Sequence, residues 1–282
     1  MASRQVVLIT GCSSGIGRSA ALEAARRGHQ VFASARNRND LADLERGDLH
    51  ALSLDVTDGA SVRSAIGFVL SRAGRLDALV NNAGYAQYGA AEDVSAEEWR
   101  AQFDVNFFGT LEVTRAALPA LRAAGGGTIV MVSSVAGKVP VPFAAPYCSA
   151  KHALEALSDA LRVELYPFGI RVAVVEPGPT PTRFTERARS LVAPLMSRPG
   201  PYRTLYAGAE RAMDGDFQKG GQSAEAVARV IVDVLEASRP RARYPVGAMA
   251  RALIPLKSVL PERWLDWMMR RSLRIPGPES RR

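Results

Sequence analysis

A short apolar run, followed at once by a glycine-rich turn and a helical pattern, constrains this chain more than any other feature. Val6–Thr10 has the composition of a buried strand, the turn holds Gly11, Gly15 and Gly17, and apolar residues recur at helical spacing over Ile16–Arg27. Glycines permit a tight turn and let the backbone approach a pyrophosphate, whose charge the helix N-terminus meets. The spacing is G-x-x-x-G-x-G, and plain turns also use glycine. The segment therefore favours a dinucleotide-binding βαβ unit without establishing one.

Strand and helix patterns alternate over the following 150 or so residues. Runs rich in β-branched residues predict further strands at Val31–Ala35, Leu49–Leu54, Leu76–Asn81, Gly127–Ser133 and Arg171–Val175. Longer stretches with helical spacing lie between them, such as Glu97–Ala123 and Ala150–Tyr166. Repeated β-α-β units form a parallel sheet with helices on both faces. We therefore expect an α/β fold of the Rossmann type, a doubly wound parallel sheet.

Length and composition fit one folded domain with a C-terminal extension. The chain has 282 residues, of which 47% are hydrophobic and 23% charged, an ordinary globular composition. We place the main domain at 1–238, with an insert at about 183–221 that covers the substrate, because the strand pattern disappears there. A plain surface loop explains that insert equally well. The extension at 239–282 is expected to be helical and to pack on the same domain.

Targeting and redox signals favour the cytoplasm. The first apolar run meets Gly11 too soon for a secretory signal, and no apolar stretch approaches the roughly 20 residues of a membrane span. Cys12 and Cys148 are the only cysteines and give no disulfide framework, which is typical of a reducing compartment. His29, His50 and His152 are not spaced as metal ligands, so no metal is expected.

The net charge of +8 belongs to the extension. Residues 239–282 hold 11 Lys and Arg against 3 Asp and Glu, which gives 11 − 3 = +8, so the first 238 residues are balanced. No helix-turn-helix, zinc-ligand or aromatic-basic pattern accompanies this charge, and we expect no nucleic-acid binding. A basic amphipathic segment can cover the substrate crevice, pack on a partner subunit or lie on an anionic membrane. Pro255 and Pro261 interrupt the segment, which weakens the interpretation as a membrane-bound helix.

The end of the second predicted strand indicates the cofactor. Folds that bind NAD place an acidic residue there to accept hydrogen bonds from the ribose, whereas Ala33-Ser34-Ala35-Arg36 offers a guanidinium. Arg36 can bind a 2′-phosphate through charge-assisted hydrogen bonds, with Ser34, Asn37 or Arg18 as helpers. The competing interpretation is a solvated surface arginine. NADP(H) is therefore favoured over NAD(H).

A tyrosine and a lysine four residues apart suggest acid–base chemistry. Tyr147 and Lys151 would share one face of a helix, where the lysine and a cationic nicotinamide are expected to lower the pKa of the phenol. Such a pair alone is common by chance. Ser134 follows a predicted strand, so its hydroxyl faces the crevice where open α/β sheets bind ligands, while Ser133 would point to the opposite side.

Taken in order, these motifs resemble the signatures of the short-chain dehydrogenases/reductases. The resemblance covers about residues 5–185 and rests on Thr10–Gly17, Asn81-Asn82-Ala83-Gly84, Asn106, Ser134, Tyr147 with Lys151, and Pro177-Gly178. Residues 147–154 and the long tail are most similar to the 17β-hydroxysteroid and retinol dehydrogenase-like branch, although steroid or retinoid specificity is not carried over.

The resemblance implies a role for each matching residue. Tyr147 would be the general acid/base, and Lys151 would lower its pKa and hold the nicotinamide ribose. Ser134 would orient the carbonyl, and Asn106 would hold a water that links Lys151 to solvent. The implied cofactor-binding residues are Gly11, Ser13, Ser14, Gly15, Ile16, Gly17, Arg36, Asp55, Val56, Asn82, Ala83, Gly84, Tyr147, Lys151, Pro177, Gly178, Thr180 and Thr182.

We therefore expect an NADP(H)-dependent oxidoreductase that interconverts a carbonyl and an alcohol, with an apolar small molecule as substrate. The family also implies a homodimer or homotetramer. The alternative is a non-catalytic NADP(H)-binding sensor or scaffold with the same fold. A nucleotide-sugar epimerase or dehydratase would need a larger C-terminal domain. The sequence leaves the substrate, the direction and the role of the basic extension open.

Overall fold

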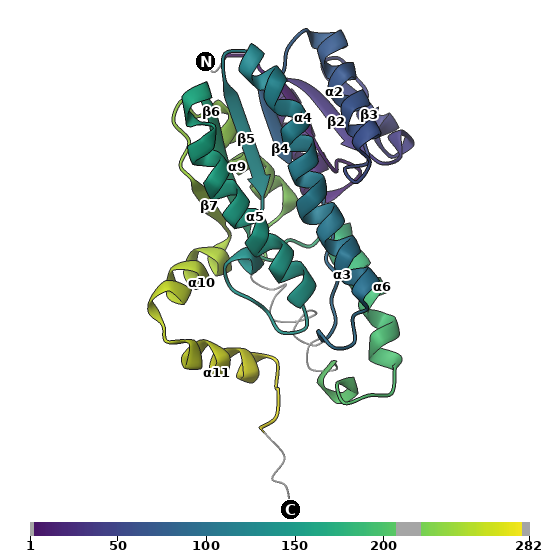
Figure 1. The fold of residues 1–282 in the computed structure, drawn as a ribbon, viewed down its shortest axis with the longest axis vertical. Coiled ribbons are helices and arrows are strands. Elements are labelled where there is room, and N and C mark those ends of the chain that lie inside the picture. The colour runs from purple at the N-terminus through teal and green to yellow at the C-terminus, as the bar shows by residue number, and fades with distance from the viewer. Residues whose placement is uncertain (1–2, 207–220, 278–282) are drawn as a thin grey trace, which may run out of the picture.

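A seven-stranded parallel sheet forms the centre of the molecule in the computed structural model, which describes residues 3–206 and 221–277 (Figure 1). Its strands are β1 (Val6–Ile9), β2 (Gln30–Ala35), β3 (Leu49–Ser53), β4 (Ala78–Asn81), β5 (Gly127–Val132), β6 (Ile170–Pro177) and β7 (Arg243–Val246). The order is β3-β2-β1-β4-β5-β6-β7, so the winding reverses between β1 and β4. Ligands of such sheets bind where this reversal opens a crevice at the carboxyl ends.

Helices cover both faces of the sheet (Figure 1). One face packs on α1 (Gly15–Arg26) and α9 (Ala224–Glu236), and the other packs on α2 (Gly59–Ala73), α4 (Thr110–Ala123) and α5 (Ala145–Glu164). Successive residues of β1 alternate between these two apolar cores and all are buried, as expected of a strand covered on both sides. The predicted doubly wound α/β fold is confirmed.

Two elements differ from the sequence-based expectation. The extension that we started at 239 contributes β7 to the sheet, parallel to β6, because the short edge strand Arg-Tyr-Pro-Val carries little apolar signal. The expected insert begins with a regular helix, α6 (Arg183–Ser197), in which Pro194 and several charges obscure the helical pattern. Within that insert, 207–220 lie outside the described residues.

The predicted helix over Glu97–Ala123 is interrupted. It consists of α3 (Ala96–Phe103), a π-helical turn η2 (Asp104–Gly109) and α4. Single π turns inside helices accompany functional sites. This turn carries Asn106, so the irregularity falls on a residue singled out from the sequence.

The extension continues from β7 into two further helices, α10 (Ala248–Val259) and α11 (Glu262–Ser272). Ala250 of α10 and Leu265 of α11 are buried, whereas Trp264 and Trp267 remain 52% and 50% exposed. Among the helices that the structure describes, none is long and apolar enough to cross a membrane.

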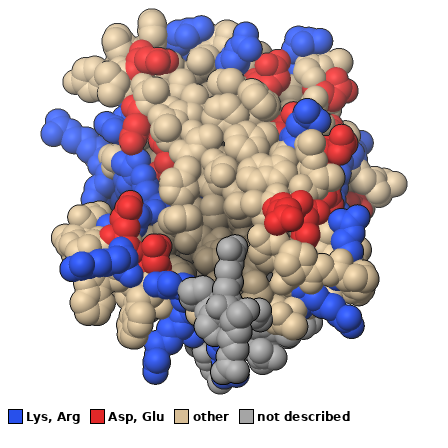
Figure 2. All heavy atoms as spheres, turned by 60° about the horizontal axis from the view of Figure 1, so that its bottom comes forward, with Lys and Arg blue, Asp and Glu red and all other residues tan. Residues whose placement is uncertain are grey.

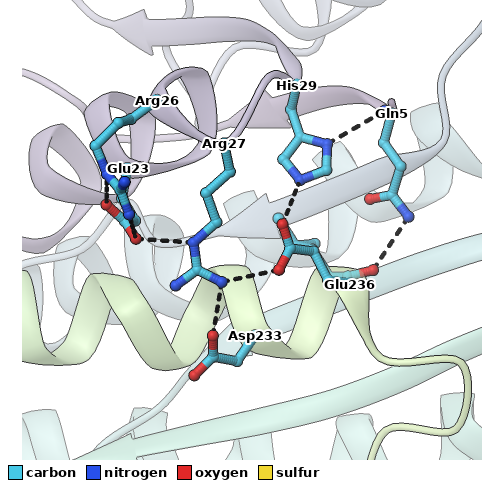
Figure 3. A network of polar contacts seen from close by, with 8 residues as sticks. Gln5, Glu23, Arg26, Arg27, His29, Asp233 and Glu236 are labelled. Atoms are coloured by element: carbon cyan, nitrogen blue, oxygen red, sulfur yellow. Dashed lines mark hydrogen bonds and ion pairs between the residues drawn. The ribbon is translucent and has the colours of Figure 1, made fainter. Parts of the chain in front are cut away.

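A polar network joins α1 to α9 across the sequence (Figure 3). Arg27 pairs with Glu23 of its own helix at 2.8 Å and with Asp233 and Glu236 of α9 at 2.7 and 2.8 Å. The buried His29 lies 3.3 Å from Glu236 and accepts a hydrogen bond from the Gln5 backbone. Arg27 thus fixes the end of the first helix against the helix that closes this face.

Replacing Arg27 with methionine is expected to lower the free energy of unfolding by about 1 to 2 kcal/mol, because Glu236 loses a partner in a partly buried network. Urea denaturation followed by circular dichroism measures this change. Arg26 is the matched control, since it is 69% exposed and its one ion-pair partner within residues 3–206 and 221–277 is Glu23. An Arg26→Met variant as unstable as Arg27→Met would contradict the assignment.

Candidate active site

A cavity of about 740 Å³ lies at the carboxyl ends of the strands. Figure 2 shows this end of the molecule, where a hollow lies within a mainly uncharged area and charged side chains gather around it. Nearly every residue that we predicted for the site lines this cavity: Gly11, Ser13, Ser14, Gly15, Ile16, Arg36, Asp55, Val56, Asn82, Ala83, Gly84, Ser134, Tyr147, Lys151, Pro177, Gly178, Thr180 and Thr182. Gly17 and Asn106 do not line it.

The glycine-rich turn is shaped for close backbone approach. Gly11 and Gly15 have φ of +73° and +59°, a region that favours glycine. A Cβ on Gly17 would lie 2.4 Å from both the Gly11 oxygen and the Asn82 Nδ2. Asn82 Nδ2 donates to the carbonyls of Thr10 and Gly11 at 2.9 and 3.0 Å. Gly17 and Asn82 therefore build the turn from behind.

The N-terminus of α1 is open towards the cavity. The side chain of its N-cap residue, Ser14, makes no capping hydrogen bond. The first backbone N–H groups of the helix are therefore left without a side-chain cap. A Cβ on Gly15 would lie 3.1 Å from Thr182, which begins α6 on the opposite wall. An anion-binding helix end and a narrow cradle are thus brought together, and the pyrophosphate of a dinucleotide fits this arrangement.

Arg36 and Asp55 line the cavity from the segments that follow β2 and β3. Burial opposes ionisation of Asp55, yet its pKa lies below the ordinary value because Thr57 donates two hydrogen bonds to the carboxylate. Asp40 also lines the cavity. No acidic residue stands at the end of β2, and the exposed Arg36 takes that place.

The three suggested helpers of Arg36 are already engaged. Ser34 is buried and donates to the Ile9 carbonyl at 3.0 Å, so its predicted contact with a phosphate is wrong. The Asn37 side chain accepts from the Asn39 backbone at 3.1 Å, and Arg18 forms an ion pair with Asp43. The pleat explains the error, because Ser34 points to the face of β2 opposite Ala33 and Ala35, and that face is also buried.

Tyr147, Lys151 and Ser134 converge at the middle of the cavity. Both residues of α5 are nearly buried, with 7% of Tyr147 and 5% of Lys151 exposed. Lys151 Nζ donates to the Val132 carbonyl at 2.8 Å and lies 5.9 Å from the Tyr147 ring centroid. A hydrogen bond joins Tyr147 to Ser134, whose own Oγ accepts from the Ala136 backbone at 3.1 Å. The two segments that the sequence separates by 13 residues thus meet.

Burial dominates the protonation of this group. It raises the pKa of Tyr147 above its ordinary value, although the hydrogen bond with Ser134 acts in the other direction. Burial also lowers the pKa of Lys151 to about 8, against the charge of Glu155. In the protein alone, burial therefore outweighs the nearby Lys151. The expected lowering of the phenol pKa includes the charge of a bound nicotinamide and stays a prediction.

Asn106 is bound to the backbone beside the cavity. Its Oδ1 accepts from the Tyr85 N–H at 3.1 Å and its Nδ2 donates to the Tyr85 carbonyl at 2.9 Å. A Cβ on Gly84 would lie 3.2 Å from the same oxygen. The side chain therefore orients the segment after β4, and the implied water at Asn106 stays a prediction.

Several cavity residues were missed from the sequence. Gln222 donates to the Gly178 carbonyl and to Thr180 Oγ1 at 3.0 and 2.8 Å, and so fixes the loop after β6. An apolar wall is formed by Tyr88, Val141, Phe143, Phe184, Val192, Met196, Tyr206 and Leu273. These residues come from separate loops and helices, and only the scatter of aromatic residues after 183 gave a signal. Among the described residues, no group of His, Cys, Asp and Glu could hold a metal.

The chain is similar in sequence to proteins of a known family over nearly its whole length. The family description "short chain dehydrogenase" matches residues 5–192. A probable short-chain type dehydrogenase/reductase of Helicobacter pylori, VdlC, is 34% identical over 94% of this chain and 96% of its own length. An NADPH-dependent 3-dehydrocapnine reductase of Ornithobacterium rhinotracheale is 34% identical over 97% and 99%. Bovine retinol dehydrogenase 8 is 36% identical over 91% and 86%.

Solved structures agree with this relationship. A short-chain dehydrogenase from Streptomyces avermitilis superposes with a TM-score of 0.79 at 33% identity, covering 98% of this chain and 100% of its own. A short-chain dehydrogenase from Burkholderia cenocepacia in complex with NADP has a TM-score of 0.75 at 25% identity, covering 95% and 98%. Together with the ordered motifs at one cavity, these similarities show that the chain belongs to the short-chain dehydrogenase/reductase family of oxidoreductases.

Proposed function

We propose that the protein is an NADP(H)-dependent oxidoreductase that interconverts a carbonyl and an alcohol, with Tyr147 as its general acid/base. The convergence of Tyr147, Ser134 and Lys151 on the cavity that holds the glycine-rich turn carries this proposal. A bound nicotinamide supplies the hydride, and the protein supplies position and proton transfer. A sensor or scaffold would need the turn alone, which makes the non-catalytic alternative weaker.

Each residue has a role in this proposal. In the direction of reduction, Tyr147 donates its proton to the carbonyl oxygen, and Ser134 donates a hydrogen bond to the same oxygen as charge develops on it. Lys151 holds the nicotinamide ribose and favours the phenolate that remains. A water near Asn106 would return the proton from solvent. The high pKa of the buried Tyr147 suits a group that must reach the substrate in its neutral form.

The remaining residues would hold the cofactor. The turn from Gly11 to Gly17 and the start of α1 would bind the pyrophosphate. Asn82, Ala83 and Gly84 lie behind this turn. Asp55 and Val56 border the adenine, and the segment from Pro177 and Gly178 through Thr180 to Thr182 borders the nicotinamide. Arg36 favours NADP(H), in line with the NADPH-dependent relative and the NADP complex.

Replacing Arg36 with alanine is expected to weaken NADPH binding by about 10- to 100-fold and to leave NADH binding nearly unchanged, because only NADPH carries the phosphate that the guanidinium would bind. Titration of the nicotinamide fluorescence with each cofactor measures both affinities. Arg38→Ala is the control, since Arg38 is exposed, pairs with Glu45 and does not line the cavity. Equal losses for NADPH and NADH would exclude a role for Arg36 in choosing the cofactor.

The apolar wall supports an apolar substrate, and reduction is the proposed direction because cells keep the NADP pool reduced.

We also propose a homodimer or homotetramer in the cytoplasm. Leu273, just after α11, lines the cavity, which favours a covering role for the extension. The other proposed role of the extension is contact with an anionic membrane, which the exposed Trp264 and Trp267 support.

The deciding experiment is a screen of ketones, aldehydes, steroids and retinoids with NADPH and NADH in parallel, read from the nicotinamide absorbance. Consumption of NADPH with one substrate group supports the proposal and names the substrate class. Tight NADPH binding without turnover over the whole panel would instead support a sensor.

A further inference from the structure

A cluster of charged side chains lies beside the helix that carries Tyr147 and Lys151. It consists of Lys138 from the segment after η3 (Val135–Gly137), Glu155 and Asp159 from α5, Glu176 from β6 and Arg243 from β7. None of the five lines the cavity. The cluster is therefore separate from the residues that we propose to contact cofactor and substrate.

Glu155 is the centre of this cluster. Its Oε2 lies 2.9 Å from Lys138 Nζ and 3.2 Å from the Arg243 guanidinium. Arg243 also reaches Asp159 at 2.7 Å and Glu176 at 3.5 Å. The segment after η3 and the last strand are thus tied to one carboxylate of α5 that is itself only 3% exposed.

The cluster holds more acceptors than donors. Glu155 Oε1, both Glu176 oxygens and Ser133 Oγ are buried without a hydrogen-bond partner in the described part of the chain. Ser133 donates its backbone N–H to Val175, which places it beside Glu176 at the ends of β5 and β6. Burial, and then the charge of Glu155, raise the pKa of Glu176 to about 7. Three carboxyl groups therefore share two cations in this cluster, Lys138 and Arg243.

Lys151 lies one helical turn before Glu155. Its ammonium group is buried, and the Val132 carbonyl is the one acceptor found for it among the described residues. Both residues pack against Gly137, where an added Cβ would lie 3.2 Å from the Glu155 Cγ and from the backbone oxygen of Lys151. Among the described residues Lys151 forms no ion pair, so Glu155 acts on its ammonium group through space from one turn along the helix. The charge of Glu155 raises the pKa of Lys151, against the larger effect of burial.

We propose that Glu155 is a positioning residue that supplies the buried counter-charge of Lys151, and that Lys138 and Arg243 hold its carboxylate in place. A buried ammonium group stays charged only where a partner offsets its desolvation. The groups that face Glu155 are Lys151 and Asp159 on α5, Lys138 after η3, Glu176 on β6 and Arg243 on β7. The effect on turnover rests on the proposed function, whereas the charge of Lys151 does not.

The protonation of Lys151 can be measured without any substrate. The chain contains four lysines, Lys138, Lys151, Lys219 and Lys257, so that ¹³Cε-labelled lysine gives few NMR signals. Glu155→Gln is expected to shift the titration midpoint of Lys151 to lower pH by about one pH unit, because it removes the negative charge and keeps the shape of the side chain. Asp159→Asn is the matched control, because Asp159 also lies on α5 and pairs with Arg243, and it should leave the midpoint unchanged.

A second variant moves the midpoint in the opposite direction. Lys138→Met removes a cation that competes with Lys151 for Glu155 and should shift the Lys151 titration to higher pH. This arm decides the question if Glu155→Gln does not fold. An unchanged midpoint in Glu155→Gln, or a midpoint in Lys138→Met that does not rise, would overturn the proposal.

The turnover arm uses the substrate that the screen identifies. As the pH rises and Lys151 loses its proton, kcat should fall. This fall should occur at a lower pH in Glu155→Gln than in the wild-type enzyme, by the same amount as the NMR midpoint, while Asp159→Asn keeps the wild-type profile. If no substrate is turned over, the proposed function fails but the titration of Lys151 still tests Glu155. A shifted Lys151 titration with an unshifted pH profile of kcat would overturn the link to turnover.

Discussion

Replacement of Tyr147 by phenylalanine is expected to reduce kcat by roughly 10²- to 10⁴-fold, the usual contribution of a general acid or base, with little change in NADPH affinity. The phenol is the group that donates to the carbonyl, and the ring would keep its contact with Phe184, at 5.6 Å between centroids. Single-turnover absorbance measurements give the rate, and fluorescence titration gives the affinity.

Tyr88→Phe is the control for this variant. Tyr88 is a partly buried tyrosine of the same cavity, and loss of solvent raises its pKa to about 12. Removal of its hydroxyl should leave kcat within a few-fold of the wild type. Normal turnover by Tyr147→Phe, or equal losses in both variants, would refute the assigned role of Tyr147.

The second large effect is expected from Gly17→Ala. The new methyl group would lie 2.4 Å from the Gly11 carbonyl oxygen, a backbone atom that cannot yield without moving the turn. Overpacking of this kind lowers the free energy of unfolding by about 1 to 3 kcal/mol. A shift of the turn by about 1 Å can cost roughly 100-fold in turnover, because the cofactor is displaced with it.

Gly67→Ala provides the comparison, since Gly67 is a helical glycine of α2 with no atom near its added Cβ. This substitution should raise the free energy of unfolding by about 0.5 to 1 kcal/mol through the lower entropy of the unfolded chain. Urea denaturation of both variants tests the sign. If Gly17→Ala behaved like Gly67→Ala, the close approach in the turn would be contradicted.

Most of the sheet could be predicted because its strands are buried on both faces. Continuous apolar runs such as Val6–Ile9 and Ile129–Val132 give a strong signal, and the turn after β1 fixes the first crossover. The residues that line the cavity could be placed for the same reason, since parallel strands all end at one edge. Six of the seven strands were found in this way.

Tertiary contacts explain what could not be predicted. β7 is a strand because β6 offers it an open edge, and its own Arg-Tyr-Pro-Val composition says little. The helical start of the insert depends on Ala188 and Val192 packing towards the cavity wall. The engagement of Asn106 with Tyr85 joins two segments 21 residues apart, and no local pattern reports it.

The position of Arg243 on the last strand has a consequence for synthesis. Arg243 follows Asp159 and Glu155 by 84 and 88 residues, so a ribosome reaches it roughly 4 to 18 seconds after those acids at ordinary elongation rates. Until then, Glu155, Asp159 and Glu176 face Lys138 without their second cation, and α5 and β6 repel one another at this point. A chain that ends before β7 lacks Arg243, so this repulsion would persist in it. The charge balance beside α5 is thus completed only when the final strand joins the sheet.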